Sequence, residues 1–322
     1  MAHEIDMSNA RANVAWVGRV PWHGLGQELP EGAPIETWAE AAGLTWEARR
    51  SPLFRVDPQG SWTTVQGKEA LYRSDTGVDL GIITPSYQIV QPAAVLDFYS
   101  HLTEALGFKL EVAGALFGGK KVWALAKTGE GLTLGQDEQV NGYVLLATSY
   151  DGTMATVATR TTVRVVCNNT LTLAVGADGK RAEVRIPHNS AFNAEQVRAQ
   201  LGLEHNTAWA EFANAAHSLS TTRVSREDAV RFFLDVFYPG QDEIDTGNRI
   251  IAEVAGLALS APGQQTEAAA GTAWGLLNAV TYHTDHARKT RSDDSRLNRA
   301  WFGDGEVLKR RAFARACEMA GA

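Results

Sequence analysis

Residues 139–166, QVNGYVLLATSYDGTMATVATRTTVRVV, decide the fold of this chain. Two runs in which apolar and polar residues tend to alternate flank the dipeptide Asp151-Gly152. Asp-Gly favours a two-residue turn between antiparallel strands, because both positions tolerate positive φ angles. The stretch therefore predicts a β-hairpin, and counting back from the turn places Tyr143 opposite Arg160.

The two faces of this hairpin differ in chemistry, because successive side chains of a strand point to opposite sides. One face is apolar and requires a core; it comprises Val140, Val144, Leu146, Val157, Val163 and Val165. The other face contains no acidic residue and comprises Gln139, Asn141, Tyr143, Met154, Thr156, Arg160, Thr162 and Arg164. We expect this second face to bind a polyanion, to be solvated, or to be covered by a helix that pairs its arginines.

The polar face offers groups that bind single-stranded nucleic acid. Arg160 and Arg164 are four residues apart, so their Cα atoms lie about 13 Å apart, which is about two steps of a nucleic-acid backbone. Arginine binds phosphate through a planar fork of donors, tyrosine can stack on an unpaired base, and Asn and Thr can bind phosphate or sugar. The predicted nucleic-acid-binding residues are Arg160, Arg164, Tyr143, Asn141, Thr162, Lys120 and Lys121, with the basic segment 288–311 widening the positive field.

Further strands and helices are predicted around this hairpin. A second hairpin is expected at 110–127 around Gly118-Gly119, and a helix is expected from Pro92 to a stop at Gly107. Short strand patterns occur at 54–56 and 63–65, and helical periodicity dominates the later part of the chain.

These elements predict an α+β fold with an antiparallel hairpin sheet core and packed helices, followed by a mostly helical C-terminal region. The expected segments are an irregular Trp-rich segment at 1–50, an α+β core at 51–190 and a helical region at 191–322.

The composition excludes several classes of protein. The 322 residues are 44% hydrophobic and 21% charged, which is typical of a globular chain and not of a disordered or collagen-like one. No apolar run approaches about 18 residues, and the first residues lack the apolar core of a secretion signal, so we expect neither a membrane span nor export. Two cysteines are too few for a disulfide framework and favour a reducing cytosol.

The formal net charge of -7 argues mildly against nucleic acid as a partner. The charge is unevenly distributed, because residues 201–287 contain 4 basic and 11 acidic residues, whereas 151–200 and 288–322 are net basic. Charge runs of this size often reflect only solvated helix surfaces. The acidic total therefore does not exclude a basic binding surface elsewhere.

The sequence contains no recognisable catalytic motif. His283 and His286 form an i, i+3 pair that could face one metal ion, but no further His or Cys at ligand spacing accompanies them. Cys167 follows an apolar strand and fits a small buried side chain better than a nucleophile. The Gly-rich turn that begins at Trp22 and His23 follows no strand and opens no helix, so it is not a phosphate loop. We expect no catalysis and no bound cofactor or metal.

Several stretches resemble one protein family. RTTVRVVCNNTLTLA (160–174), TAWGLLNAVTYHTDH (272–286), RAWFGDGEVLKRRA (299–312) and PWHGLG (21–26) are similar to phage and plasmid-like proteins that carry the domain of unknown function 932. The resemblance covers nearly the whole chain. It implies a phage, prophage or plasmid origin and a location in the cytoplasm of the bacterial host, but no assigned activity.

The order of elements is similar to a second group of proteins. A helix, a hairpin and a longer hairpin that leads into a helix resemble the core of single-strand-annealing recombinases of the phage Red-beta type. This resemblance implies homo-oligomeric rings or filaments that hold a single strand along a basic groove beside a β-hairpin.

We therefore expect a non-enzymatic phage or plasmid protein that binds single-stranded nucleic acid and anneals or protects single-stranded DNA. One alternative is a protein-interaction or host-takeover factor that uses the Trp-rich N-terminal segment as an anchor. A less favoured alternative is a metal-dependent hydrolase built on His283 and His286.

Overall fold

The computed structural model describes residue 6 and residues 12–18, 25–164, 170–172, 174–175, 180–181, 183–203, 207–241 and 248–322, without the side chains at 164, 174–175, 180–181 and 293–294. The chain forms two compact units that are interleaved along the sequence. Unit 1 comprises Met1–Gly129, Val144–Thr159 and Glu183–Glu204; unit 2 comprises Glu130–Tyr143, Arg160–Ala182 and His205–Ala322. The expected division into three consecutive segments stays a prediction.

The largest sheet has the strand order β10-β9-β8-β7-β6-β1-β2, and β13 also pairs with β9. Its strands are β1 (Val14–Trp16), β2 (Gln27–Glu28), β6 (Lys109–Leu116), β7 (Lys121–Leu134), β8 (Glu138–Ser149), β9 (Thr156–Arg164), β10 (Thr170–Thr172) and β13 (Glu183–Ile186). A 3-10 turn, η1 (Phe117–Gly119), joins β6 to β7, so the hairpin predicted around Gly118-Gly119 is confirmed. Strands β7, β8 and β9 contribute residues to both units.

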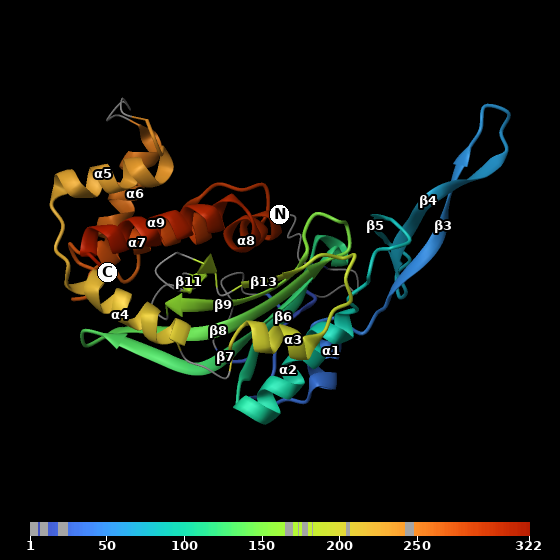
Figure 1. Cartoon of the computed structure of the whole chain (residues 1–322), viewed down its shortest axis with the longest axis horizontal. Coiled ribbons are helices and arrows are strands. Elements are labelled where there is room, and N and C mark those ends of the chain that lie inside the picture. Colours follow the sequence, from blue (N-terminus) through green and yellow to red (C-terminus); the bar gives the residue numbers. More distant parts are fainter. Residues whose placement is uncertain are drawn as a thin grey trace. The chain divides into compact units, whose positions relative to one another are not determined.

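Unit 1 contains the helices α1 (Ile35–Ala41), α2 (Pro92–Leu106) and α3 (Ala194–Gln200) (Figure 1). Helix α2 begins at Pro92, because the first helical turn does not need the missing N–H, and it ends at Gly107, whose φ is 68°. The buried hydroxyl of Tyr99 donates a hydrogen bond of 2.6 Å to the carbonyl oxygen of Ala124, which holds α2 on β7. The core of unit 1 includes Val95, Leu96, Phe98, Leu102, Ala113, Val144 and Leu146.

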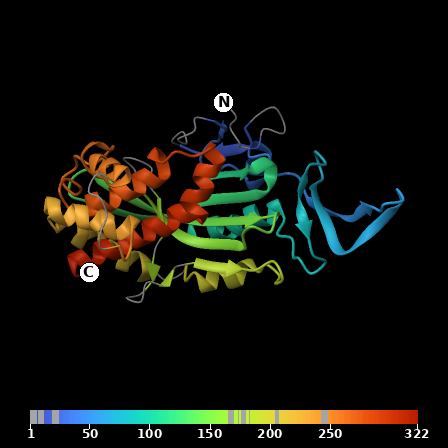
Figure 2. The ribbon, with the colours of Figure 1, turned by 90° about the horizontal axis from the view of Figure 1, so that it is seen from above.

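A second sheet of unit 1 is antiparallel and consists of β3 (Ala48–Val56), β4 (Trp62–Arg73) and β5 (Asp79–Ile83), in that order. The outer part of the β3–β4 hairpin extends away from the rest of unit 1 (Figures 1 and 2). We call this outer part, residues 53–68, the arm. The base of the sheet is anchored by Ala48, Leu71, Leu80 and Ile83, which are buried in the core of unit 1.

Unit 2 is mostly helical. Its elements besides the strands above are α4 (Thr207–Thr221), α5 (Arg226–Phe237), α6 (Arg249–Ser260), α7 (Ala273–Tyr282), the π-helical turn η2 (His283–Ala287), α8 (Asp293–Phe302), α9 (Asp304–Ala320), β11 (Ala174–Val175) and β12 (Lys180–Arg181). Large aromatic side chains dominate its core, among them Trp209, Phe212, Phe232, Phe233 and Trp274.

The predicted α+β class is confirmed, because antiparallel sheets with packed helices precede a helical C-terminal region. In the described part of the chain, every helix is too short or too polar to span a lipid bilayer.

The predicted two-residue turn of the central hairpin is wrong. Strands β8 and β9 are joined by residues 150–155, although Gly152 has the expected positive φ of 74°. The carboxylate of Asp151 accepts hydrogen bonds from the N–H and hydroxyl of Thr153, at 3.0 and 2.6 Å, and Ser149 Oγ binds the backbone of Met154. These short side chains satisfy the loop backbone in place of ladder bonds, which lengthens the loop.

The longer loop changes which residues share a face. The hydroxyls of Thr148 and Thr156 lie 2.8 Å apart and are therefore on the same side of the sheet. Strand alternation then places Arg160 on this side and Tyr143 on the other. The predicted pairing of Tyr143 with Arg160 on one polar face is thus wrong, because a slip of one residue exchanges the faces of a strand.

Candidate nucleic-acid interface

Arg160, the central residue of the predicted site, is buried in unit 2. Its side chain is 2% exposed, and its Nη1 donates to Glu130 Oε1 at 3.2 Å. A buried guanidinium needs such a carboxylate, because an unpaired charge in the interior is costly. Arg160 can reach a phosphate only if the residues that bury its side chain move and its contact with Glu130 is broken.

The other predicted residues do not form an exposed cluster. Tyr143 is 4% exposed, and Thr162 and Lys121 are also buried. Burial lowers the pKa of Lys121, although nearby Asp151 opposes the shift. Asn141 and Lys120 are partly buried, and the side chain of Arg164 lies outside the described residues.

Several cations of the basic segment 288–311 are bound by other groups of the protein. Arg288 and Arg299 both bind the carboxylate of Asp304, at 2.8 and 2.7 Å, and hold its pKa well below the usual range. Lys309 is buried against Asp285 at 2.8 Å. Arg311 donates to a backbone carbonyl of α5. The segment therefore offers fewer exposed cations than its sequence suggests.

The two histidines that could have shared a metal have different surroundings. His283 is buried, with Nδ1 3.1 Å from Glu253 Oε1 and its ring against Phe237, and burial lowers its pKa despite the carboxylate. The ring of His286 lies beside Tyr282. No group of three or more potential metal ligands occurs among the residues that the structure describes. Cys167, Trp22, His23 and Gly24 lie outside those residues.

The arm presents a surface that the sequence did not single out. Trp62 is 75% exposed, Val56 56% and Phe54 48%. Val56 lies opposite Trp62 in the register, and Phe54 lies two residues before Val56, so the three side chains share one face. The rings of Phe54 and Trp62 meet edge to face, with centroids 6.5 Å apart. We call these three residues the stacking face.

Hydrogen bonds at the tip of the arm stabilise the turn between β3 and β4. The carboxylate of Asp57 accepts hydrogen bonds from the N–H groups of Gln59 and Ser61, at 3.0 and 2.8 Å, and Gly60 has a φ of 84°. An acidic side chain that binds its own turn, followed by a glycine with positive φ, closes a short loop. The only carboxylate of the arm is thereby directed into the tip.

The arm also contains two exposed cations, Arg55 and Lys68. Arg55 lies opposite Thr63, on the reverse side from the stacking face. Within the described ranges the structure gives neither cation an ion-pair partner. Arg49 and Arg50, at the base, are instead paired with Glu47 and Glu69.

The base of the arm is held firmly in unit 1. Gln91, the residue before α2, binds the backbone N–H and carbonyl of Ala48 with its side-chain amide. Arg50 donates to the carbonyl oxygens of Pro85 and Tyr87 as well as to Glu69. The stacking face is therefore presented by a fixed base, which lowers the entropy lost when a ligand binds.

Sequence patterns located these strands but not their exposure. The 54–56 and 63–65 strand predictions are confirmed by β3 and β4. Apolar residues at alternating positions normally indicate a core-facing side, so the pattern gave no signal that this face meets solvent.

The fold and the arm together define an α+β protein with a projecting aromatic hairpin. The chain belongs to a family described as the domain of unknown function DUF932, whose model matches residues 79–301, more than half of the chain. The resemblance to this family found in the sequence is thereby confirmed over these residues, whereas the resemblance to single-strand-annealing recombinases stays a prediction. Searches of the curated proteins and of the solved structures find no match.

Proposed function

We propose that this protein binds single-stranded nucleic acid through the stacking face of the arm, without catalysis. The observation that carries the proposal is the exposure of Trp62 and Phe54 on one side of a projecting hairpin. Aromatic side chains bind unpaired bases of any sequence, because every base has a π face, and each stacked base contributes about 1–3 kcal/mol.

The size of the stacking face favours a thin ligand. A buried aromatic side chain covers about 150–250 Å², so two rings and one valine cover far less than the roughly 800 Å² that each partner buries in a stable protein interface. Two stacked bases match this area. The small size of the face therefore supports a single strand over a folded protein partner.

The charge of the arm supports the same ligand. Arg55 and Lys68 are exposed on a segment whose one carboxylate is bound in its own turn. A strand that contacts both cations must pass over the edge of the ribbon, because Arg55 lies on the reverse side from the stacking face. Two such phosphate contacts give a slope of about -1.4 for the logarithm of affinity against the logarithm of salt concentration. The affinity of one arm is accordingly modest.

A modest affinity per arm suits the wider role that we propose, annealing or protection of single-stranded DNA by a homo-oligomer of a phage or plasmid protein in the bacterial cytoplasm. Several arms on one strand raise the overall affinity without a new contact, because later binding steps become intramolecular. Stacking grips the strand at intervals and leaves other bases free to pair. Light scattering with and without a long oligonucleotide measures the assembly.

The test is fluorescence anisotropy of a labelled poly-dT oligonucleotide. We expect the double variant Phe54→Ala/Trp62→Ala to bind at least about tenfold more weakly than the wild type. Leu259→Ala is the matched control, since Leu259 is also highly exposed but lies on α6. A folded wild type that does not bind at low salt, or a double variant that binds equally well, contradicts the proposal.

A second candidate function is docking of a protein partner on the arm. The stacking face consists of apolar side chains only, and exposed apolar patches commonly mark protein interfaces. Loss of a partner from the double variant, together with unchanged oligonucleotide binding, favours this candidate.

A further inference from the structure

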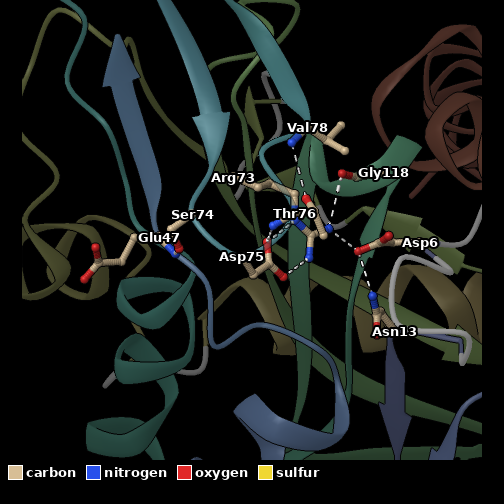
Figure 3. A network of polar contacts seen from close by, with 9 residues as sticks. All are labelled: Asp6, Asn13, Glu47, Arg73, Ser74, Asp75, Thr76, Val78 and Gly118. Atoms are coloured by element: carbon tan, nitrogen blue, oxygen red, sulfur yellow. Dashed lines mark hydrogen bonds and ion pairs between the residues drawn. The ribbon is translucent and has the colours of Figure 1, made fainter.

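Arg73 is the last residue of β4 and is fully buried. It lies where the β3–β4 hairpin joins the rest of unit 1, and we call this region the root of the arm. Figure 3 shows its guanidinium between two carboxylates, those of Asp75 and Asp6. Asp75 receives two bonds, from Nε at 3.0 Å and from Nη2 at 2.8 Å. Asp6 binds Nη1. The guanidinium of Arg73 therefore binds one carboxylate from the turn between β4 and β5 and one from the N-terminal part of the chain.

The same guanidinium binds two further elements of unit 1. Nη1 donates to the carbonyl oxygen of Gly118 in η1 at 3.3 Å, and the group lies 4.6 Å from the ring centre of Trp46, two residues before β3. Gly119 leaves room for it, because a Cβ there would lie 3.0 Å from Nη1 and its φ is 98°. Arg73 thus joins β4, the start of β3, η1 and the N-terminal segment.

Asp6 is itself held in place by Asn13. The side-chain amide of Asn13 donates to Asp6 Oδ2 at 2.7 Å, and its backbone N–H donates to the Asp6 carbonyl at 2.9 Å (Figure 3). Asn13 directly precedes β1, and Gly43 leaves space for its side chain, since a Cβ at Gly43 would lie 2.3 Å from Asn13 Oδ1. The carboxylate that reaches Arg73 is therefore anchored beside β1, which lies between β6 and β2 in the large sheet.

We propose that Asp6 acts as a strap that fixes the direction of the arm, so that loss of its contact with Arg73 loosens the root and weakens ligand binding by the stacking face. The effect on binding rests on the proposed function, whereas the effect on the root does not. Asp6 and Asn13 are positioning residues, since they act on the arm through Arg73.

The length of β4 explains why the root controls the stacking face. Trp62 and Arg73 are the two ends of one strand, about 36 Å apart at about 3.3 Å per residue. A tilt of about 10° at the root moves Trp62 by about 6 Å, more than the thickness of a stacked base. A loosened root therefore spreads the stacking face over many positions and raises the entropy cost of binding.

The test compares Asp6→Asn with Glu104→Gln, a matched loss of one negative charge at an exposed position of α2. Hydrogen–deuterium exchange reports on the root amides, among them those of Arg73, Ser74 and Gly77, which bind Val78, Glu47 and Arg73 carbonyls. We expect Asp6→Asn to raise their exchange rates on the order of tenfold, because the buried guanidinium loses one of its two counter-charges. Glu104→Gln should leave these rates unchanged.

Asn13→Ala is a milder second variant, which keeps all groups that contact Arg73 but removes the side-chain amide that holds the carboxylate of Asp6. It should shift exchange in the same direction by a smaller factor, and Asp6→Glu should restore part of the protection. Unchanged root exchange in folded Asp6→Asn and Asn13→Ala overturns the proposal.

The two proposals fail in different ways. Faster root exchange in Asp6→Asn without oligonucleotide binding by the wild type supports the strap and contradicts the proposed function. Oligonucleotide binding that depends on Trp62 but is identical in Asp6→Asn supports the function and contradicts the strap.

Discussion

In two hairpins of this protein, the exposure of the side chains is the opposite of what their polarity suggests. The β8–β9 hairpin contains the residues that looked most suited to an open cationic face, and Arg160 and Tyr143 are buried. The β3–β4 hairpin has an apolar face that the sequence analysis did not single out, and its Trp62 and Phe54 are exposed. Alternation along a strand therefore shows which side chains share a face, but not which face meets water.

The neighbours of each hairpin explain the difference. Strand β9 pairs with β8 on one side and with β10 and β13 on the other, so it lies inside a wide sheet. The arm consists of two strands only, because β5 pairs with β4 no further out than Glu69. Two-stranded ribbons have no second layer to bury their apolar side. The single strand that we propose as ligand would cover this exposed aromatic face.

The largest expected effect separates the arginines of the two hairpins. Arg160→Met should lower the free energy of unfolding by about 3–5 kcal/mol, because it removes the buried contact between the guanidinium and the carboxylate of Glu130. Arg55→Met should change it by less than about 0.5 kcal/mol, since Arg55 is exposed. Urea denaturation measures both. Equal, small effects would mean that Arg160 lies on an open face in solution.

The aromatic residues of the two hairpins should also differ, because truncation of one should affect ligand binding and truncation of the other should affect stability. Trp62→Ala should weaken oligonucleotide binding by about 1–3 kcal/mol with little change in stability, because the ring is mostly outside the fold. Tyr143→Ala should instead cost about 3 kcal/mol or more of stability, as truncation of a buried aromatic does. Anisotropy and urea denaturation of both variants separate the two effects. The comparison breaks down if Tyr143→Ala is fully stable.

The two hairpin loops provide a smaller contrast. Ser149→Ala should lower stability by about 1 kcal/mol, because Ser149 Oγ both donates to and accepts from the backbone of Met154. Ser61→Ala, in the tip of the arm, should have almost no effect, because Asp57 binds the backbone N–H of Ser61 and not its hydroxyl. Thermal unfolding of the two variants compares them. Equal shifts would argue against the six-residue loop between β8 and β9.

The smallest expected effect is on pH dependence and compares Lys121 with Lys68. Burial lowers the pKa of Lys121 in the folded protein, so the unfolded chain binds its proton more tightly. The resulting penalty is fully present below the folded pKa and disappears as pH rises through the ordinary lysine pKa of 10.5. Wild type should therefore gain stability relative to Lys121→Met in this alkaline window. Lys68→Met, which removes one positive charge at an exposed position, is the control for the charge change. Urea denaturation at several alkaline pH values measures the effect, and a difference between wild type and Lys121→Met that does not change with pH would contradict it.

The site was less predictable than the fold, for reasons that particular residues show. Pro92 and Gly107 bounded α2 correctly, since these residues act on the local backbone. Asp151-Gly152 located a turn correctly but not its length, because the side chains of Ser149 and Asp151 compete for the loop backbone. That one difference placed Arg160 and Tyr143 on opposite faces of the sheet.

The sequence by itself determined the α+β class, the main helices and the membership in the DUF932 family, because periodicity, caps and family motifs are local properties of the chain. Only the tertiary structure decided which surfaces are open. It buried Arg160 beside Glu130, left Trp62 in solvent, and brought Asp6 to Arg73 across 67 positions of sequence. Burial depends on which elements pack on a face, and that is settled by contacts between residues far apart in the chain.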